Sequence, residues 1–268
     1  MQKKPLFYRD LNQSAEDTLV LIHGGFSNGY LTWRRQIDTL GEQYRLIICD
    51  RRGHGKSPQD PKPYTIAQDA QDIIAILKEI GIDSFHLVGH SYGGLVAIEV
   101  AYQLADKIST LHLLEPPCFS LFSNDPEVSS LNNKIKSLFE ESSERGIEEL
   151  AKGFFETMIG TEAAEHLRDS LAWQKVLDET ERLINEEYPA EYSSEKITDL
   201  SLPIYIYTGG RSQLGLRKIA YETVKKLPTA KLIDIPEATH DLPRAQPRFD
   251  DALLASIKDY EKDLDKYC

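Results

Sequence analysis

Short, mainly apolar runs alternate along this chain with longer stretches in which apolar residues recur every three or four positions. The runs cover residues 18–22, 44–49, 85–88, 109–114, 203–210 and 231–235. Such runs are typical of buried parallel strands, whereas the longer period, clear at 65–80, indicates amphipathic helices. Residues 6–11 add one edge strand. Strands that alternate with helices predict an α/β fold with a mostly parallel sheet flanked by helices.

The stretch from residue 118 to residue 202 breaks this alternation. It consists of helical segments rich in Glu and Ser and has no strand-like run. A plain connection between two elements of a sheet is much shorter. The sequence therefore predicts a core formed by 1–117 and 203–268, with 118–202 inserted as a helical cap.

The charge and the cysteines narrow the class of protein. Lys plus Arg number 31 against 43 Asp plus Glu, for a formal charge of −12, and no basic stripe with interleaved aromatics stands out. This balance disfavours nucleic acid and anionic membrane surfaces as partners. Three scattered cysteines suggest neither a disulfide framework nor a metal site. With no secretory h-region and no membrane-length apolar run, we expect a cytoplasmic protein.

The clearest chemical signal is Gly89-His90-Ser91-Tyr92-Gly93, between the run 85–88 and a helix that begins near residue 94. A serine on a sharp strand-to-helix turn tolerates only glycine two positions before and after it, because larger side chains would collide with the strand and helix. The turn lifts the hydroxyl above the sheet and aims helix N-terminal amides at the group it attacks. Ser91 is therefore the predicted nucleophile.

This pentapeptide resembles the nucleophile elbow of the α/β-hydrolase family, and three further motifs of the family follow in the expected order. They are His23-Gly24-Gly25-Phe26, the Asp50 to Ser57 turn that is similar to DxxGxGxS, and the loop from Pro236 to Pro243 around His240. The resemblance covers most of the chain from Leu19 to Pro247. It implies the α/β-hydrolase fold, with the cap inserted after the family's sixth strand.

The same resemblance assigns roles to the motifs. Backbone amides of Gly25, with Gly24 or Phe26 as alternatives, and of Tyr92 would form an oxyanion hole. His240 would be the general base. We interpret His23 as a structural residue, and Asp50 as part of the scaffold that binds local backbone amides.

The acid of the triad is the one part that departs from the majority pattern. Most family members carry an Asp in a G-x-x-D pattern after the seventh strand, and the matching position here is Ser212. Either the triad is broken, or the acid is Glu115, after the sixth strand. Leu114-Glu115-Pro116-Pro117 is similar to a segment of zearalenone-type lactone hydrolases in which this Glu is the acid. Asp234, Glu237 and Asp241 are disfavoured, because they lie too close to His240 in sequence or point along their own strand.

A histidine activates a serine hydroxyl only when a carboxylate fixes its tautomer. With Ser91, His240 and Glu115, we predict a serine hydrolase that cleaves an ester or lactone, including a zearalenone-like lactone, through an acyl-enzyme. Phe26, Phe119 and Trp173 are predicted to line the substrate pocket.

No metal and no organic cofactor is expected, and the expected partner is a small-molecule substrate. Whether the chain forms a homodimer stays open. A serine nucleophile disfavours dehalogenases and epoxide hydrolases, which need a carboxylate. Two alternatives stand beside the ester hydrolase: a carbon–carbon bond hydrolase of diketone-like substrates, and a ligand-binding protein without turnover.

Overall fold

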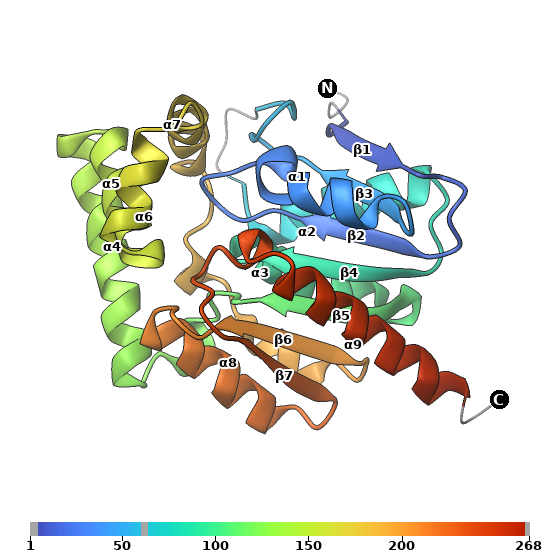
Figure 1. The fold of residues 1–268 in the computed structure, drawn as a ribbon. Helices are drawn as coiled ribbons and strands as arrows, with labels where there is room; N and C mark the ends of the chain where they lie inside the picture. The colour runs from blue at the N-terminus through green and yellow to red at the C-terminus, as the bar shows by residue number, and fades with distance from the viewer. Residues whose placement is uncertain (1–4, 60–63, 266–268) are drawn as a thin grey trace.

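The computed structural model describes residues 5–59 and 64–265 of the 268-residue chain. Seven strands form one sheet in the order β1-β3-β2-β4-β5-β6-β7 (Figure 1). Their bounds are β1 Tyr8–Leu11, β2 Thr18–Ile22, β3 Arg45–Cys49, β4 Phe85–His90, β5 Ile108–Leu114, β6 Ile204–Gly209 and β7 Ala230–Ile235. Only β1 pairs antiparallel, with β3 at the edge. The predicted sheet is therefore confirmed.

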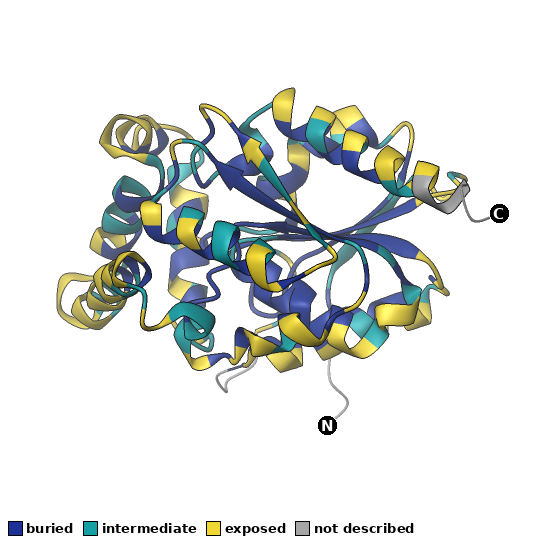
Figure 2. Cartoon of the chain, turned by 90° about the horizontal axis from the view of Figure 1, so that it is seen from below, coloured by how far each residue is buried: buried dark blue, intermediate teal, exposed yellow. Residues whose placement is uncertain are grey.

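Helices cover both faces of the sheet, which explains why the central strands are apolar throughout. Their bounds are α1 Gly29–Leu40, α2 Ile66–Glu79, α3 Tyr92–Leu104, α8 Leu214–Lys226 and α9 Arg248–Asp265. In β2, Val20 and Ile22 belong to the core shared with α2, α3 and α8, and Leu19 and Leu21 to the core shared with α1 and α9. Alternate side chains of a strand point to opposite faces, so both sets are buried (Figure 2).

Local signals in the sequence account for the helix boundaries. Asn28 caps α1 by accepting a hydrogen bond from the Leu31 amide. Thr65 and Gln68 form a capping box at the start of α2. Gly81 follows α2 with a φ of +68°, the left-handed conformation that glycine adopts without a steric penalty.

Residues 118–202 contain no named strand among their described positions, and we call this segment the helical insertion. Its helices are α4 Pro126–Arg145, α5 Ile147–Ile159, α6 Thr161–Arg168 and α7 Trp173–Leu183. They gather at one end of the sheet (Figure 1). Phe26 of the core packs there against Leu150 and Leu183. The insertion thus lies over the edge of the sheet that carries Phe26.

The strand that precedes the insertion is β5 in chain order. In the part of the chain that the structure describes, a single strand, β1, comes before β2. The final helix, α9, ends at Asp265. None of the described helices is both long and apolar enough to cross a membrane.

Candidate active site

Ser91 lies on the predicted turn between β4 and α3, in a conformation that few residues adopt. Its φ is 52° and its ψ is −123°. A Cβ on Gly93 would lie 2.4 Å from the carbonyl oxygen of His23, and one on Gly89 would lie 2.5 Å from the carbonyl oxygen of Gly93. Both glycines are therefore required by close backbone contacts. The Ser91 amide donates to Leu114 O at 2.8 Å, which holds the turn against the end of β5.

Glu115 directly follows β5 and faces His240 across the end of the sheet. Its backbone amide donates to the carbonyl oxygen of Tyr207 in β6 at 3.1 Å. The buried carboxylate places Oε2 at 2.7 Å from His240 Nδ1. Its other oxygen accepts from the Thr208 hydroxyl and the Gly209 amide, each at 2.9 Å. Both oxygens are occupied, so the carboxylate has a fixed direction.

The surroundings of Glu115 keep it ionised. Burial alone would raise the pKa of the carboxyl group, but the contacts with His240, the Ser212 hydroxyl and the Gly209 amide lower that pKa by more. The net pKa lies below the ordinary value. Ser212, where the majority pattern has its Asp, is buried beside Glu115. The carboxylate is ionised at neutral pH and can orient the histidine.

The other carboxylates near His240 in sequence are engaged elsewhere. Asp234 accepts from the Tyr221 hydroxyl at 2.9 Å, Glu237 pairs with Arg211, and Asp241 pairs with Arg244 at 3.2 Å. Asp50, earlier in the chain, accepts from the backbone amides of Gly29 at 2.9 Å and Lys56 at 3.0 Å. Asp50 thus has the scaffold contacts predicted for it. Of these carboxylates, only that of Glu115 has a hydrogen bond to the His240 ring in the described structure.

His240 leaves its second nitrogen free. Nε2 is buried and has no hydrogen-bond partner among residues 5–59 and 64–265. His240 and Ser91 line the same cavity. The backbone of His240 is held by His90, whose Nε2 donates to the His240 carbonyl at 2.8 Å. Burial and the neighbouring His240 lower the pKa of His90 to about 4, so that His90 stays neutral.

Sequence reasoning did not give His90 a role. Its only signal is its place beside Ser91 on the elbow. The structure shows that it holds the loop of His240 instead.

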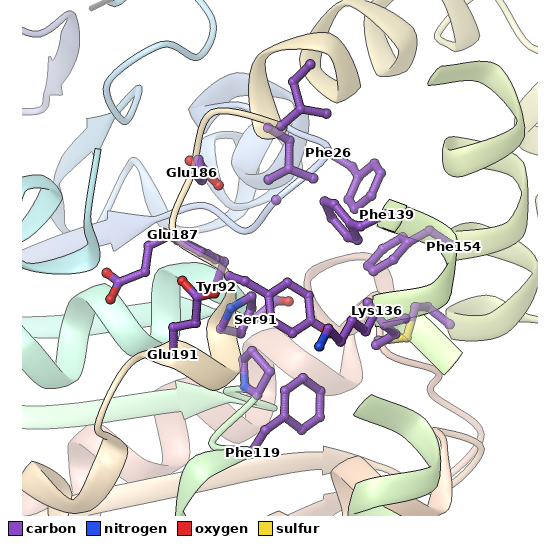
Figure 3. A pocket seen from close by; sticks show the side chains of 18 of the residues that line it. Phe26, Ser91, Tyr92, Phe119, Lys136, Phe139, Phe154, Glu186, Glu187 and Glu191 are labelled. Atoms are coloured by element: carbon purple, nitrogen blue, oxygen red, sulfur yellow. The ribbon is translucent and has the colours of Figure 1, made fainter. Parts of the chain in front are cut away.

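The cavity has a volume of about 370 Å³ and is mostly apolar (Figure 3). Its apolar lining includes Phe26, Phe119, Phe139, Phe154, Met158, Leu183 and Leu216, and its charged lining is Lys136, Glu140, Glu186, Glu187 and Glu191. Phe26 and Phe119, which we predicted to line the substrate pocket, both line this cavity.

Trp173 does not line this cavity, contrary to prediction. It begins α7 and packs inside the insertion, with its ring centroid 6.4 Å from that of Phe155. The apolar period of α7 turns it toward α5 and not toward the sheet. Sequence alone could not distinguish these two directions.

The two residues predicted to form an oxyanion hole lie near Ser91. Gly25 and Tyr92 line the cavity together with Ser91 and His240. In the described part of the chain, no backbone carbonyl accepts from the amides of Gly25, Phe26 or Tyr92 outside regular helices and strands. A Cβ on Gly24 would lie 3.1 Å from that of Ser91, so the loop packs closely on the nucleophile.

Strained backbone gathers at this site. Five non-glycine residues in the described ranges have a positive φ. Three of them are Phe26, Ser91 and Glu115, with φ values of 55°, 52° and 45°. Each such residue costs about 1–3 kcal/mol, and functional sites are where this strain concentrates. Among the residues with defined positions, no group of three or more His, Cys, Asp or Glu could hold a metal ion.

Comparison with known proteins identifies the architecture. Residues 17–243 match the family described as alpha/beta hydrolase fold. A protein of Azorhizobium caulinodans named "Putative carbamate hydrolase RutD" is 30% identical over 97 residues, which are 36% of this chain and 37% of that protein. The acetyltransferase component of the acetoin cleaving system of Cupriavidus necator is 33% identical over 103 residues, 38% of this chain and 27% of that one. The chain thus matches about a third of the length of these curated relatives.

Solved structures are similar over nearly the whole chain. A thermophilic esterase from Thermogutta terrifontis has a TM-score of 0.74 at 22% identity, covering 95% of this chain and 93% of its own. An enol-lactonase from Burkholderia xenovorans has a TM-score of 0.70 at 19% identity, covering 96% of both chains. At these identities the likeness concerns the fold.

Proposed function

Because the chain belongs to the α/β-hydrolase family, we propose that it is a serine hydrolase that cleaves an ester or lactone bond. The observation that carries the proposal is the 2.7 Å contact between His240 Nδ1 and the buried carboxylate of Glu115. The opposite nitrogen of His240 has no partner in the described part of the chain, and His240 lines a cavity with Ser91. This is the arrangement that a serine nucleophile, a general base and an orienting acid require.

The proposed reaction has two halves. His240 Nε2 takes the proton of Ser91 while Oγ attacks the substrate carbonyl, and the amides of Gly25 and Tyr92 stabilise the oxyanion. His240 then gives the proton to the leaving alcohol, which in a lactone stays tethered to the acyl group. Water, activated by the same histidine, releases the acid from Ser91. Glu115 keeps the proton on Nδ1 and stabilises the imidazolium.

The cavity favours a compact, apolar substrate. Its volume of about 370 Å³ lies near the lower end of the roughly 300–1,000 Å³ range of ligand sites. The helical insertion supplies much of its apolar lining, as a cap would. The likeness to a solved esterase and a solved enol-lactonase supports the ester and lactone class. A zearalenone-like lactone stays a prediction, since it rests on Glu115 and the two prolines after it.

The test is turnover of a panel of aryl esters, small lactones, macrocyclic lactones and aryl carbamates by wild type and by Ser91→Ala. We expect turnover of at least one ester or lactone by wild type, and loss of that turnover in Ser91→Ala. Covalent labelling of wild type by a fluorophosphonate, absent in Ser91→Ala, is the control for a folded and reactive site. Labelling without turnover of any panel member would favour the carbon–carbon bond hydrolase. Neither labelling nor turnover would favour the ligand-binding protein.

A further inference from the structure

Arg51, in the turn after β3, is buried behind the candidate active site and contacts both halves of the proposed oxyanion hole. Its side chain is 0% exposed. Nε donates to the His23 carbonyl at 3.1 Å, and Nη2 donates to the Gly24 carbonyl at 3.2 Å. Its guanidinium carbon lies 4.4 Å from the centroid of the Tyr92 ring. Sequence reasoning treated this turn as scaffold and gave Arg51 no part.

The contact with Gly24 controls the direction of the Gly25 amide. The Gly24 carbonyl and the Gly25 N–H belong to one peptide unit, which is planar and trans, so the two groups point in opposite directions. A donor that holds the carbonyl oxygen on the Arg51 side therefore aims the N–H away from Arg51. A cationic donor also polarises the peptide, which makes its N–H a stronger donor.

His23 adds a second donor to the same oxygen. The backbone amide of Arg51 donates to His23 Nε2 at 2.9 Å, so the neutral ring carries its proton on Nδ1. Nδ1 lies 2.7 Å from the Gly24 oxygen and donates to it. Burial and the positive charge of Arg51 hold the pKa of His23 well below its ordinary value, which preserves this tautomer. The Gly24 carbonyl is thus held from two sides.

We propose that Arg51 is a positioning residue for the oxyanion hole, which it orients through the Gly24 carbonyl and through the ring of Tyr92. The proposal rests on the proposed serine hydrolase function, in which these amides stabilise the oxyanion. Arg51 touches no substrate atom itself. It acts by fixing and polarising the groups that do.

Arg51 also connects this hole to the helical insertion. Nη1 is 2.7 Å from Oδ2 of Asp69 in α2, and it is also paired with Glu186, which follows α7 in the insertion. Glu186 lies at the cavity (Figure 3). It accepts a hydrogen bond from His54 Nε2 at 2.8 Å. Glu186, from the insertion, therefore fixes the side chain of Arg51, and Arg51 in turn fixes the loop of Gly24 and Gly25. A shift of the insertion should therefore change the direction of the amides in the proposed oxyanion hole.

A second carboxylate of the insertion provides a matched control. Glu179 of α7 accepts from the other nitrogen of His54 at 2.8 Å, and from the Asn28 amide group at 2.8 Å. It has no contact with Arg51 in the described structure. Glu186→Gln and Glu179→Gln thus each remove one insertion carboxylate from His54, but only Glu186→Gln removes charge from Arg51.

The experiment compares Arg51→Lys, Glu186→Gln and Glu179→Gln with wild type. The readouts are kcat, KM, the affinity for an arylboronic acid, which forms a tetrahedral adduct with the serine, and the unfolding midpoint. Lysine keeps the charge but loses the planar fork of donors. We expect Arg51→Lys to lower kcat and boronate affinity by about 10–100-fold with KM within about threefold, since one lost oxyanion donor costs about 10²–10³.

For the matched pair, we expect Glu186→Gln to lower kcat and boronate affinity by roughly 3–10-fold, a fraction of the cost of a lost donor. Glu179→Gln should stay within about twofold of wild type. Equal effects of the two glutamine variants would overturn the proposal and make the cluster a structural anchor only. This pair decides the question even if Arg51→Lys fails to fold. If boronate affinity instead survives in Ser91→Ala, the proposed function itself has failed.

Discussion

Two histidines of this protein lie against buried glutamates, and only one of them has the geometry of a general base. His240 contacts Glu115 through Nδ1 at 2.7 Å and leaves Nε2 unpaired in the described structure, in a cavity that also exposes Ser91. His54 has a carboxylate on each nitrogen, Glu179 and Glu186, both at 2.8 Å. A histidine that is bound on both sides can fasten two segments together, but it has no nitrogen left to move a proton.

The origin of the glutamates explains the difference. Glu115 lies at the end of a core strand, with its amide and one carboxylate oxygen bound to β6 and the other oxygen bound to His240. Glu179 and Glu186 come from the helical insertion and reach His54 in the core turn. The first pair is rigid because the sheet holds it. The contacts of His54 with Glu179 and Glu186 join the insertion to the core. They are ion pairs when His54 is protonated, so their strength depends on the charge of His54.

The largest expected effect comes from Glu115→Gln. An amide cannot stabilise the imidazolium and favours the wrong tautomer, so turnover should fall by roughly 10³–10⁴ while KM changes little. Steady-state kinetics on the best ester or lactone measures this. Glu179→Gln makes the same substitution beside His54 and should retain turnover. If Glu115→Gln kept wild-type rates, the acid would have to be another residue.

A smaller effect is expected from Ser212→Asp, because a second carboxylate would then lie beside Glu115. Like charges raise the pKa of a carboxyl group, so less of Glu115 would be ionised at mildly acidic pH. The acid limb of the pH profile of kcat/KM should move upward by about one pH unit. Ser212→Asn has the same size without the charge and should leave the limb in place. An unchanged profile in Ser212→Asp would mean that the two side chains do not interact.

The smallest effect on turnover is expected from His54→Gln, which should act on stability. Burial lowers the pKa of His54, Glu186 raises it, Arg51 lowers it, and hydrogen bonds to Glu179 and Glu186 raise it further, for a net increase. A raised pKa stabilises the folded state fully below the ordinary value near 6.5, and this stabilisation is lost as pH rises through the folded-state pKa.

Urea unfolding of wild type and His54→Gln at pH 6 and pH 9 measures this dependence. The stability difference should be on the order of 3 kcal/mol at pH 6, as for a broken buried pair, and smaller at pH 9. A difference that grew toward pH 9 would show that neutral His54 is the stabilising form.

The sequence by itself determined the alternation of strands and helices, the glycine-flanked turn of Ser91 and the placement of Glu115 after a strand. These features depend on neighbouring residues, through hydrophobic period and local steric limits, so a single sequence reveals them. It also left Glu115 as the preferred acid, since parallel strands bring their carboxyl ends to one edge of the sheet.

Only the tertiary structure decided which side chains meet. Glu115 and His240 lie 125 positions apart, as do His54 and Glu179. The sequence held no sign that Arg51 contacts both Gly24 and an insertion glutamate, or that Trp173 turns away from the cavity. Such contacts depend on how the insertion docks on the sheet, and docking sums many weak interactions between distant residues. The periodicity of a helix shows that one of its faces is buried, but not which partner covers that face.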